Sequence, residues 1–310
     1  NSSGHLVIND CLFAENTSIN GGAIWSSGGE STIAHSTFEQ NEASNSGGAL
    51  YLWSTIASLT SCDFHDNSAD VWGGAILADY SELQIDDCTI SNNAAPEGSG
   101  IFAAKSNIIF VGEDSTSDDI KLYDHTEIPT TLQFSPGTNC AVTGNVTSES
   151  LGSVIFDIDS LDPQTLQLDI SESLTMDGSL SVRNDSGSLL DARVDEIVPL
   201  AQADSVEGDL SSVVFPIMPP GLGLQLIEQT SVRGGETELA VEVVEIAGAD
   251  FSETFSGDLD STPIDMISFN ANNEGSDELA ILYGGTPGGV TIYSVSSDGI
   301  PTPIEGFNAI

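Results

Sequence analysis

The chain has 310 residues, and its 48 Asp and Glu residues against five Lys and Arg residues give a formal net charge of -43 at pH 7. A surface of this charge repels phosphate backbones and anionic headgroups, which excludes nucleic acid as a partner. No stretch of the sequence approaches the ~20 consecutive apolar residues of a transmembrane helix, so we expect no membrane span in this chain.

A short motif recurs four times in the first third of the chain. Each copy has an apolar residue followed three positions later by asparagine, and three copies are followed by Gly-Gly-Ala and then Ile or Leu. Successive asparagines are 25, 26 and 26 residues apart. The repeated positions are Phe13, Phe38, Phe64 and Ile90, and Asn16, Asn41, Asn67 and Asn93.

This period, with its short alternating segments, predicts that each repeat is one turn of a parallel β-solenoid. Coils of such a fold stack at about 4.8 Å, so equivalent residues lie directly above one another. We therefore expect the four apolar residues to form an internal ladder and the four asparagines to form an amide ladder at a corner. Asn tolerates the left-handed backbone of such a corner, and the glycine pair would provide another tight corner with positive φ.

A third column of equivalent residues follows the glycine corner and is mainly aromatic. A buried or half-buried ladder is the more common use of such residues, whereas an exposed aromatic row could bind sugar rings by stacking. The sequence leaves both alternatives open. The column consists of Trp25, Tyr51, Leu77 and Phe102.

The cysteines follow the same period. Cys62 and Cys88 are 26 residues apart. We expect them to stack as a thiol ladder or to form a disulfide, because the spacing of neighbouring strands lies within the range that a disulfide tolerates. Ser36 occupies the rung between Cys62 and Cys11, so we expect Cys11 to be unpaired.

The paired F-x-x-N and G-G-A-I/L motifs resemble the repeats of polymorphic outer-membrane proteins and related right-handed β-helix surface proteins. The resemblance covers residues 1–104. It implies a pectin lyase-like parallel β-helix displayed outside the cell, as in adhesins or autotransporter passengers, and therefore an extracellular or cell-surface location. The fourth copy has Ile90 in place of Phe and Ser99 in place of Gly. We therefore expect the regular helix to fray or change its cross-section near residue 105.

Residues 105–145 carry fewer repeat signals. We expect Asp114 to Asp119 to form an exposed polar loop, and the segment from Pro129 through Pro136 and Gly137 to Cys140 to form another loop between strands. Alternating strand patterns return in residues 154–158, 166–170, 174–182, 197–200, 213–215 and 239–243, and Asp177-Gly178 is a strong turn signal. The order of these segments resembles the C-terminal part of many bacterial β-helix surface proteins. We assign residues 1–145 to the β-helix and 146–247 to its β-rich continuation or cap, which would cover exposed strand edges.

Residues 248–310 are predicted to form a separate β segment. Its acidic loop before an apolar strand resembles the FG-GAP repeats of propeller-forming surface proteins, which implies calcium and the start of a propeller-like repeat region. Calcium prefers several oxygen ligands from one short segment. The candidate ligands are Asp258, Asp260, Thr262 and Asp265, and the alternative is a solvated Asp-rich turn.

The predicted fold class is therefore all-β: a right-handed parallel β-helix, a β-rich cap or continuation, and a short C-terminal β segment. No Lys or Arg occurs in residues 1–104, which removes the usual base of a polysaccharide lyase, and Asp86 and Asp87 would point to opposite faces of a strand. We expect no catalytic residues and an extracellular structural or adhesive role. The alternatives are a carbohydrate-active enzyme or glycan-binding module, and a subunit that self-associates end to end into filaments or sheets.

Overall fold

The computed structural model describes residues 4–112, 115–123, 128–158, 166–184, 193–208, 210, 213–216, 218, 222–230, 236–245, 263–269, 278–283, 289–295 and 301–303. The chain divides into two compact units. One comprises Asn1–Pro216 and Leu224–Val243, and the other comprises Ile217–Gly223 and Val244–Ile310. Throughout the described residues every regular element is a strand, so the predicted all-β class is confirmed.

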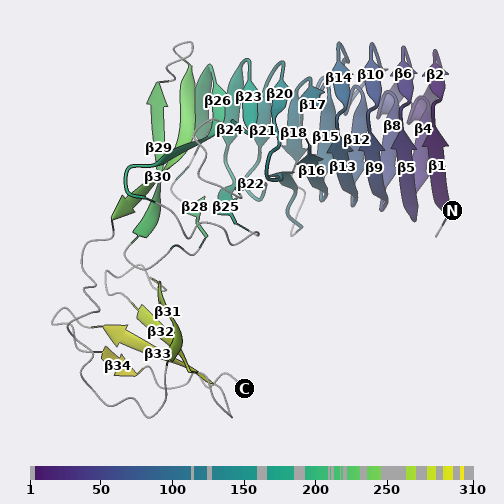
Figure 1. Ribbon diagram of the computed structural model, residues 1–310. Helices are drawn as coiled ribbons and strands as arrows, with labels where there is room; N and C mark the ends of the chain where they lie inside the picture. The colour runs from purple at the N-terminus through teal and green to yellow at the C-terminus, as the bar shows by residue number, and fades with distance from the viewer. Residues whose placement is uncertain are drawn as a thin grey trace. The chain divides into compact units, whose positions relative to one another are not determined.

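The larger unit is a parallel β-solenoid in which three long sheets run along the stack of coils (Figure 1). Sheet A consists of β1 (His5–Asn9), β5 (Glu30–Ala34), β9 (Ile56–Thr60), β13 (Glu82–Asp86), β16 (Asn107–Val111), β19 (Thr131–Phe134), β22 (Ser153–Asp157), β25 (Ser179–Arg183) and β28 (Val213–Val214). Sheet B consists of β2 (Leu12–Ala14), β6 (Thr37–Glu39), β10 (Asp63–His65), β14 (Thr89–Ser91), β17 (Ser115–Ser117), β20 (Cys140–Val142), β23 (Leu168–Ile170), β26 (Ile197–Ala203), β30 (Thr237–Glu245) and β29 (Leu222–Thr230).

Two further sheets complete the coils. Sheet C is short and consists of β3 (Thr17–Asn20), β7 (Glu42–Ser46) and β11 (Ser68–Ala69). Sheet D consists of β4 (Ile24–Ser27), β8 (Leu50–Trp53), β12 (Ile76–Asp79), β15 (Ile101–Ala104), β18 (Ile120–Tyr123), β21 (Val146–Ser148), β24 (Ser173–Met176) and β27 (Ser205–Gly208). Because sheet C ends at β11 while the other three continue, the coil loses one strand from its cross-section but keeps its parallel stacking.

The interior is built from aromatic and aliphatic residues in register. Phe38 lies opposite Phe13 on one side and Phe64 on the other, and Ile90 continues the column. The ring centroids are 4.8 Å apart for Phe13 and Phe38 and 4.5 Å apart for Phe38 and Phe64, with nearly parallel planes. Phe38, Phe64 and Ile90 are buried, whereas Phe13 in the first coil is half-buried. Their neighbours along each strand point outward because side chains alternate across a sheet.

A second ladder of phenylalanines lies in sheet A. The aliphatic column of Ile33, Leu59 and Ile85 continues in register as Phe110, Phe134 and Phe156. These three rings are fully buried, with centroid separations of 5.7 and 5.3 Å. The sequence indicated only the aliphatic part of this column, because the later coils are shorter and break the 25-residue period.

Two expected loops are partly strands. Residues 115–117 form β17 of sheet B, and Ser115 and Ser117 are buried, so the expectation of an exposed polar loop through Asp119 is wrong for this part; residues 113–114 lie outside the described residues. Cys140 begins β20 and is also buried. Both segments are polar or contain turn residues, yet parallel hydrogen bonding to the coils on either side holds them as strands.

The corners of the solenoid use a left-handed residue just before a small polar one. At the corner after sheet B the positive φ belongs to Glu15, Gln40, Asp66 and Asn92, and each precedes a ladder asparagine. The expectation that the asparagines themselves carry the left-handed backbone is therefore wrong. At the glycine corners the first glycine does have positive φ, as at Gly47 with +66°.

Asp177-Gly178 is a corner of the coil and not a hairpin turn. The strands on its two sides belong to different sheets, β24 to sheet D and β25 to sheet A. Each pairs in parallel with the previous coil. The final coil is closed differently, because β30 pairs antiparallel with β26 and β29 lies beyond it. This pairing covers an edge that would otherwise present free backbone groups.

The second unit contains sheet E, an antiparallel sheet of four strands. They are β31 (Pro263–Phe269), β32 (Glu278–Tyr283), β33 (Gly289–Val295) and β34 (Pro301–Pro303). Neighbouring strands in sequence are neighbours in the sheet, so the connection is an up-and-down meander.

Candidate functional site

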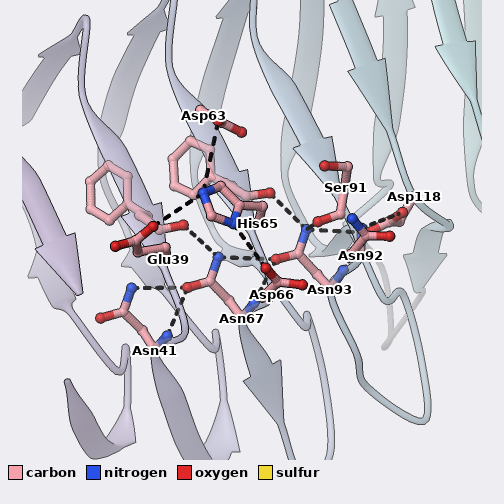
Figure 2. A network of polar contacts seen from close by, with 12 residues as sticks. Glu39, Asn41, Asp63, His65, Asp66, Asn67, Ser91, Asn92, Asn93 and Asp118 are labelled. Carbon is pink, nitrogen blue, oxygen red and sulfur yellow. Dashed lines mark hydrogen bonds and ion pairs between the residues drawn. The ribbon is translucent and has the colours of Figure 1, made fainter. Parts of the chain in front are cut away.

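An asparagine ladder follows the corner after sheet B (Figure 2). The Nδ2 of Asn41 donates to Oδ1 of Asn67 at 2.9 Å, and the Nδ2 of Asn67 donates to Oδ1 of Asn93 at 3.0 Å. The backbone N–H groups of Asn41 and Asn67 donate to the same oxygens, and Asn67 Nδ2 also donates to the carbonyl of Phe38. Each buried amide is thus satisfied by the neighbouring coils. In the first coil, Asn16 is exposed and donates to Oδ1 of Asn41.

The ladder ends on an aspartate that the sequence pattern did not reveal. The backbone N–H and Nδ2 of Asn93 donate to Oδ2 of Asp118 at 2.7 and 3.1 Å, and the backbone N–H of Asn92 donates to its Oδ1 at 3.2 Å (Figure 2). A carboxylate accepts these hydrogen bonds strongly because it carries charge. The only sequence signal is position, since Asp118 lies 25 residues after Asn93.

An imidazole surrounded by three carboxylates lies on the outer face of sheet B (Figure 2). The Nδ1 of His65 is 3.0 Å from Oδ2 of Asp66, and its Nε2 is 3.4 Å from Oε2 of Glu39 and 4.0 Å from Oδ2 of Asp63. The hydrogen bond to Asp66 and the charges of all three carboxylates raise the pKa of His65, against a smaller opposing effect of desolvation. This cluster favours the imidazolium ion over neutral imidazole.

The cysteine column contains free thiols. Cys62 and Cys88 stack at the corner after sheet A, and the backbone N–H of Cys62 donates to Sγ of Cys88 at 3.4 Å. Both are buried, whereas Cys11 is exposed, and none of the chain's four cysteines forms a disulfide. The hydrogen bond with Cys62 and burial raise the pKa of the Cys88 thiol, and burial raises that of Cys140. Thiols here replace the hydroxyls of Ser36 and Ser115, which accept from the backbone at the same corner.

The most unusual surface is the outer side of sheet D, which we call the aromatic face. In register along the sheet, Trp25 lies opposite Tyr51, Tyr51 opposite Leu77, and Leu77 opposite Phe102. Leu77 and Phe102 are buried although they point outward, because other aromatic side chains cover them. The aromatic face consists of Trp25, Tyr51, Trp53, Trp72, Leu77, Tyr80, Phe102, Ala104 and Tyr123.

The aromatic residues of this face contact one another from coil to coil. Ring centroids are 6.2 Å apart for Trp25 and Tyr51, 5.5 Å for Trp53 and Tyr80, and 5.6 Å for Trp72 and Phe102. The tryptophans remain substantially accessible, with exposed fractions of 62% for Trp25, 39% for Trp53 and 41% for Trp72. Both sequence alternatives are therefore realised, since the middle of the column is buried and its border is exposed. Trp53, Trp72 and Tyr80 do not belong to the repeated column, which is why the pattern did not indicate them.

Few charges accompany the aromatic face. Asp79 is half-buried, and burial raises its pKa while Lys105 opposes that rise. The Nζ of Lys105 donates to the hydroxyl of Tyr80 at 2.9 Å and lies 4.4 Å from the centroid of its ring. Lys121 forms an ion pair of 3.1 Å with Glu149. Each charge on this side of the solenoid therefore has an opposite charge or an aromatic ring nearby.

A polar groove adjoins the aromatic face at Tyr80 and Lys105. It has a volume of about 520 Å³ and runs along the corner between sheets D and A. The groove is lined by Ser54, Thr55, Ile56, Tyr80, Ser81, Glu82, Lys105, Ser106, Asn107, Pro129 and Thr131. These side chains provide hydroxyl, amide, carboxylate and ammonium groups, which can donate to or accept from a polar ligand.

The predicted calcium ligands fall outside this geometry. Asp258, Asp260 and Thr262 lie outside the described residues, and Asp265 lies in β31, where only the backbone is described. Within the part of the chain that the structure describes, no group of three or more His, Cys, Asp or Glu side chains is arranged to hold a metal ion. The described residues also contain no helix long and apolar enough to cross a membrane.

Residues 1–149 match the family described as "Right handed beta helix region". No curated protein matches the chain. The match and the stacked parallel sheets together place the chain in the class of parallel β-helix proteins, with a β-helix scaffold as predicted.

Proposed function

We propose that the chain is part of an extracellular structural or adhesive surface protein, in which the β-helix is a rigid scaffold. The observation that carries this proposal is the continuity of the internal ladders. Stacked phenylalanines and asparagines tie each early coil to both neighbours, and the stacked phenylalanines of sheet A continue the same device in later coils. In a solenoid, stability is a sum of such nearest-neighbour terms, so a long stack is stiff along its whole length.

The exterior supports a role in contact with water and salt. The net charge of -43 keeps a long body soluble and discourages its association with itself or with anionic surfaces. The resemblance of the F-x-x-N and G-G-A-I/L repeats to those of surface proteins points the same way. A rigid acidic body of this kind is suited to hold a binding surface away from the cell.

The test is access from outside intact cells that produce the protein. An antibody against the full chain should label unpermeabilised cells, and added protease should remove that signal while a cytoplasmic marker stays intact. Labelling that requires permeabilisation would overturn the proposed location.

A further inference from the structure

The aromatic face gathers side chains that this chain otherwise uses sparingly. Its sequence contains three tryptophans, and all three lie on this face with 39% to 62% of their surface exposed. Tyr80 is 42% exposed beside Trp53. Scattered exposed apolar residues need no explanation, but a contiguous patch of large aromatic residues marks a binding surface.

The charge of the aromatic face indicates what kind of ligand fits it. The strands β4, β8, β12, β15 and β18 contain one acidic residue, Asp79, and one basic residue, Lys121. Lys105 follows β15, so both lysines of the chain lie on this side. In a protein of net charge -43 the aromatic face is therefore locally close to neutral. An anionic ligand would be repelled by the whole molecule, and a cationic ligand would be drawn to more acidic faces such as sheet B around Asp63 and Glu39.

The shape of the aromatic face favours an extended ligand. Its residues span five neighbouring strands from β4 to β18, which corresponds to roughly 19 Å at about 4.8 Å per strand step. The adjoining groove adds hydroxyl, amide and charged groups at Ser54, Glu82, Lys105 and Asn107. Aromatic surface beside such polar groups matches the apolar C–H faces and the hydroxyl groups of sugar rings.

We propose that the aromatic face binds an uncharged polysaccharide, with the exposed tryptophans stacking against sugar rings and the groove hydrogen-bonding their hydroxyl groups. This inference deepens the proposed adhesive function and rests on it, because it names the surface and the ligand class of that function. Binding should favour a polymer over a single sugar, since several coils contribute contacts along one chain.

The test uses the full chain and its own tryptophan fluorescence, because every tryptophan lies on the proposed surface. A soluble mixed-linkage glucan, a galactomannan and dextran serve as neutral probes, with polygalacturonate as the anionic probe and the matching monosaccharides as small probes. We expect at least one neutral polymer to shift the emission saturably, and affinity electrophoresis to show retardation by the same polymer. Polygalacturonate and the monosaccharides should have little effect.

Variants locate the site. Trp25→Ala and Trp53→Ala should each weaken binding at least tenfold, whereas Leu12→Ala, which removes an equally exposed apolar side chain on sheet B, should leave it unchanged. Trp25 is the most exposed of the three tryptophans, so its replacement should not disturb folding; circular dichroism checks this.

Three results would overturn the proposal. They are the absence of binding to every neutral polymer, binding that both tryptophan variants retain, and a concentration-dependent dimer in sedimentation that Trp25→Ala abolishes, since the face would then serve contact between copies. Failure of these binding experiments leaves the cell-labelling result unaffected, and failed labelling leaves binding in solution unaffected, so the two proposals fail separately.

Discussion

Single residues inside the stack are held from two sides, so replacing one affects two neighbouring coils. Phe38 lies between Phe13 and Phe64 and is fully buried. Phe38→Ala removes its contacts with both rings and leaves a cavity, so we expect a loss of about 3–5 kcal/mol in the free energy of unfolding. Phe13→Ala is the matched control, because Phe13 is half-buried and stacks on one ring in the described residues. Chemical denaturation of both variants measures the difference, and equal losses would show that the ladder register is wrong.

The asparagine ladder depends on the same two-sided contact. Asn67→Ala deprives buried Asn41 of the oxygen that accepts from its backbone N–H and its Nδ2, and deprives the Phe38 carbonyl of a donor. Each buried group left unsatisfied costs about 1–3 kcal/mol. Asn16→Ala should cost far less, because Asn16 is exposed and its side chain donates in one direction. Denaturation curves of the two variants would contradict this account if their midpoints coincided.

His65 makes the stability depend on pH. Its pKa is raised above the unfolded value of about 6.5 by Asp66, Asp63 and Glu39. The stabilisation that this provides is fully present below pH 6.5 and disappears as the pH rises through the folded-state pKa. The stability advantage of the parent over His65→Gln should therefore shrink between pH 6 and 8.

The same histidine can be followed directly by NMR titration of its ring. We expect a midpoint above 6.5 in the parent and a lower midpoint in Asp66→Asn, because the hydrogen bond with Asp66 is the largest cause of the raised pKa. A midpoint that does not move on this substitution would assign the effect to the other carboxylates.

At the scale of whole elements, the glycine corners limit how closely the coils approach. A Cβ on Gly48 would overlap the carbonyl oxygens of Gly74 and Ser68 in the next coil, although the φ of Gly48 is not positive. Gly48→Ala should therefore separate two coils and lower the melting temperature markedly. Gly137→Ala is the control, because Gly137 has a φ of +76° and no atom within 4 Å of the added Cβ, so only its backbone strain of about 1–2 kcal/mol is tested. A milder effect at Gly48 than at Gly137 would contradict the close approach.

The elements also show which features a repeat reveals. The 25- and 26-residue steps identify the columns of Phe38 and Asn67 because equivalent residues keep the same type in each coil. The pairing of His65 with Glu39 follows from the same arithmetic, since 26 residues separate them. Asp118 and Phe110 escape the pattern because the residue type changes at those rungs and the later coils shorten.

The aromatic face illustrates a different limit. Tyr51 and Leu77 share a column that the period reveals, but the contact of Trp72 with Phe102 joins a residue before the glycine corner to one in the following coil. Side-chain direction at a corner is decided by the local backbone and not by the repeat. The binding surface therefore required the folded structure, whereas the scaffold beneath it did not.

At the scale of the whole molecule, the excess of negative charge acts on every coil. A net charge of -43 makes the carboxylates repel one another, and mobile ions screen that repulsion within about 10 Å at 0.1 M ionic strength and about 3 Å at 1 M. Because the unfolded chain keeps these charges farther apart, raising NaCl from 0.02 to 0.5 M should raise the midpoint of thermal unfolding. Calcium chloride at matched ionic strength separates this general screening from calcium binding at Asp258, Asp260, Thr262 and Asp265, which we retain as a proposal. Equal midpoints in the two salts would indicate screening alone, a higher midpoint in calcium would favour a specific site, and a midpoint that falls with NaCl would contradict the electrostatic account.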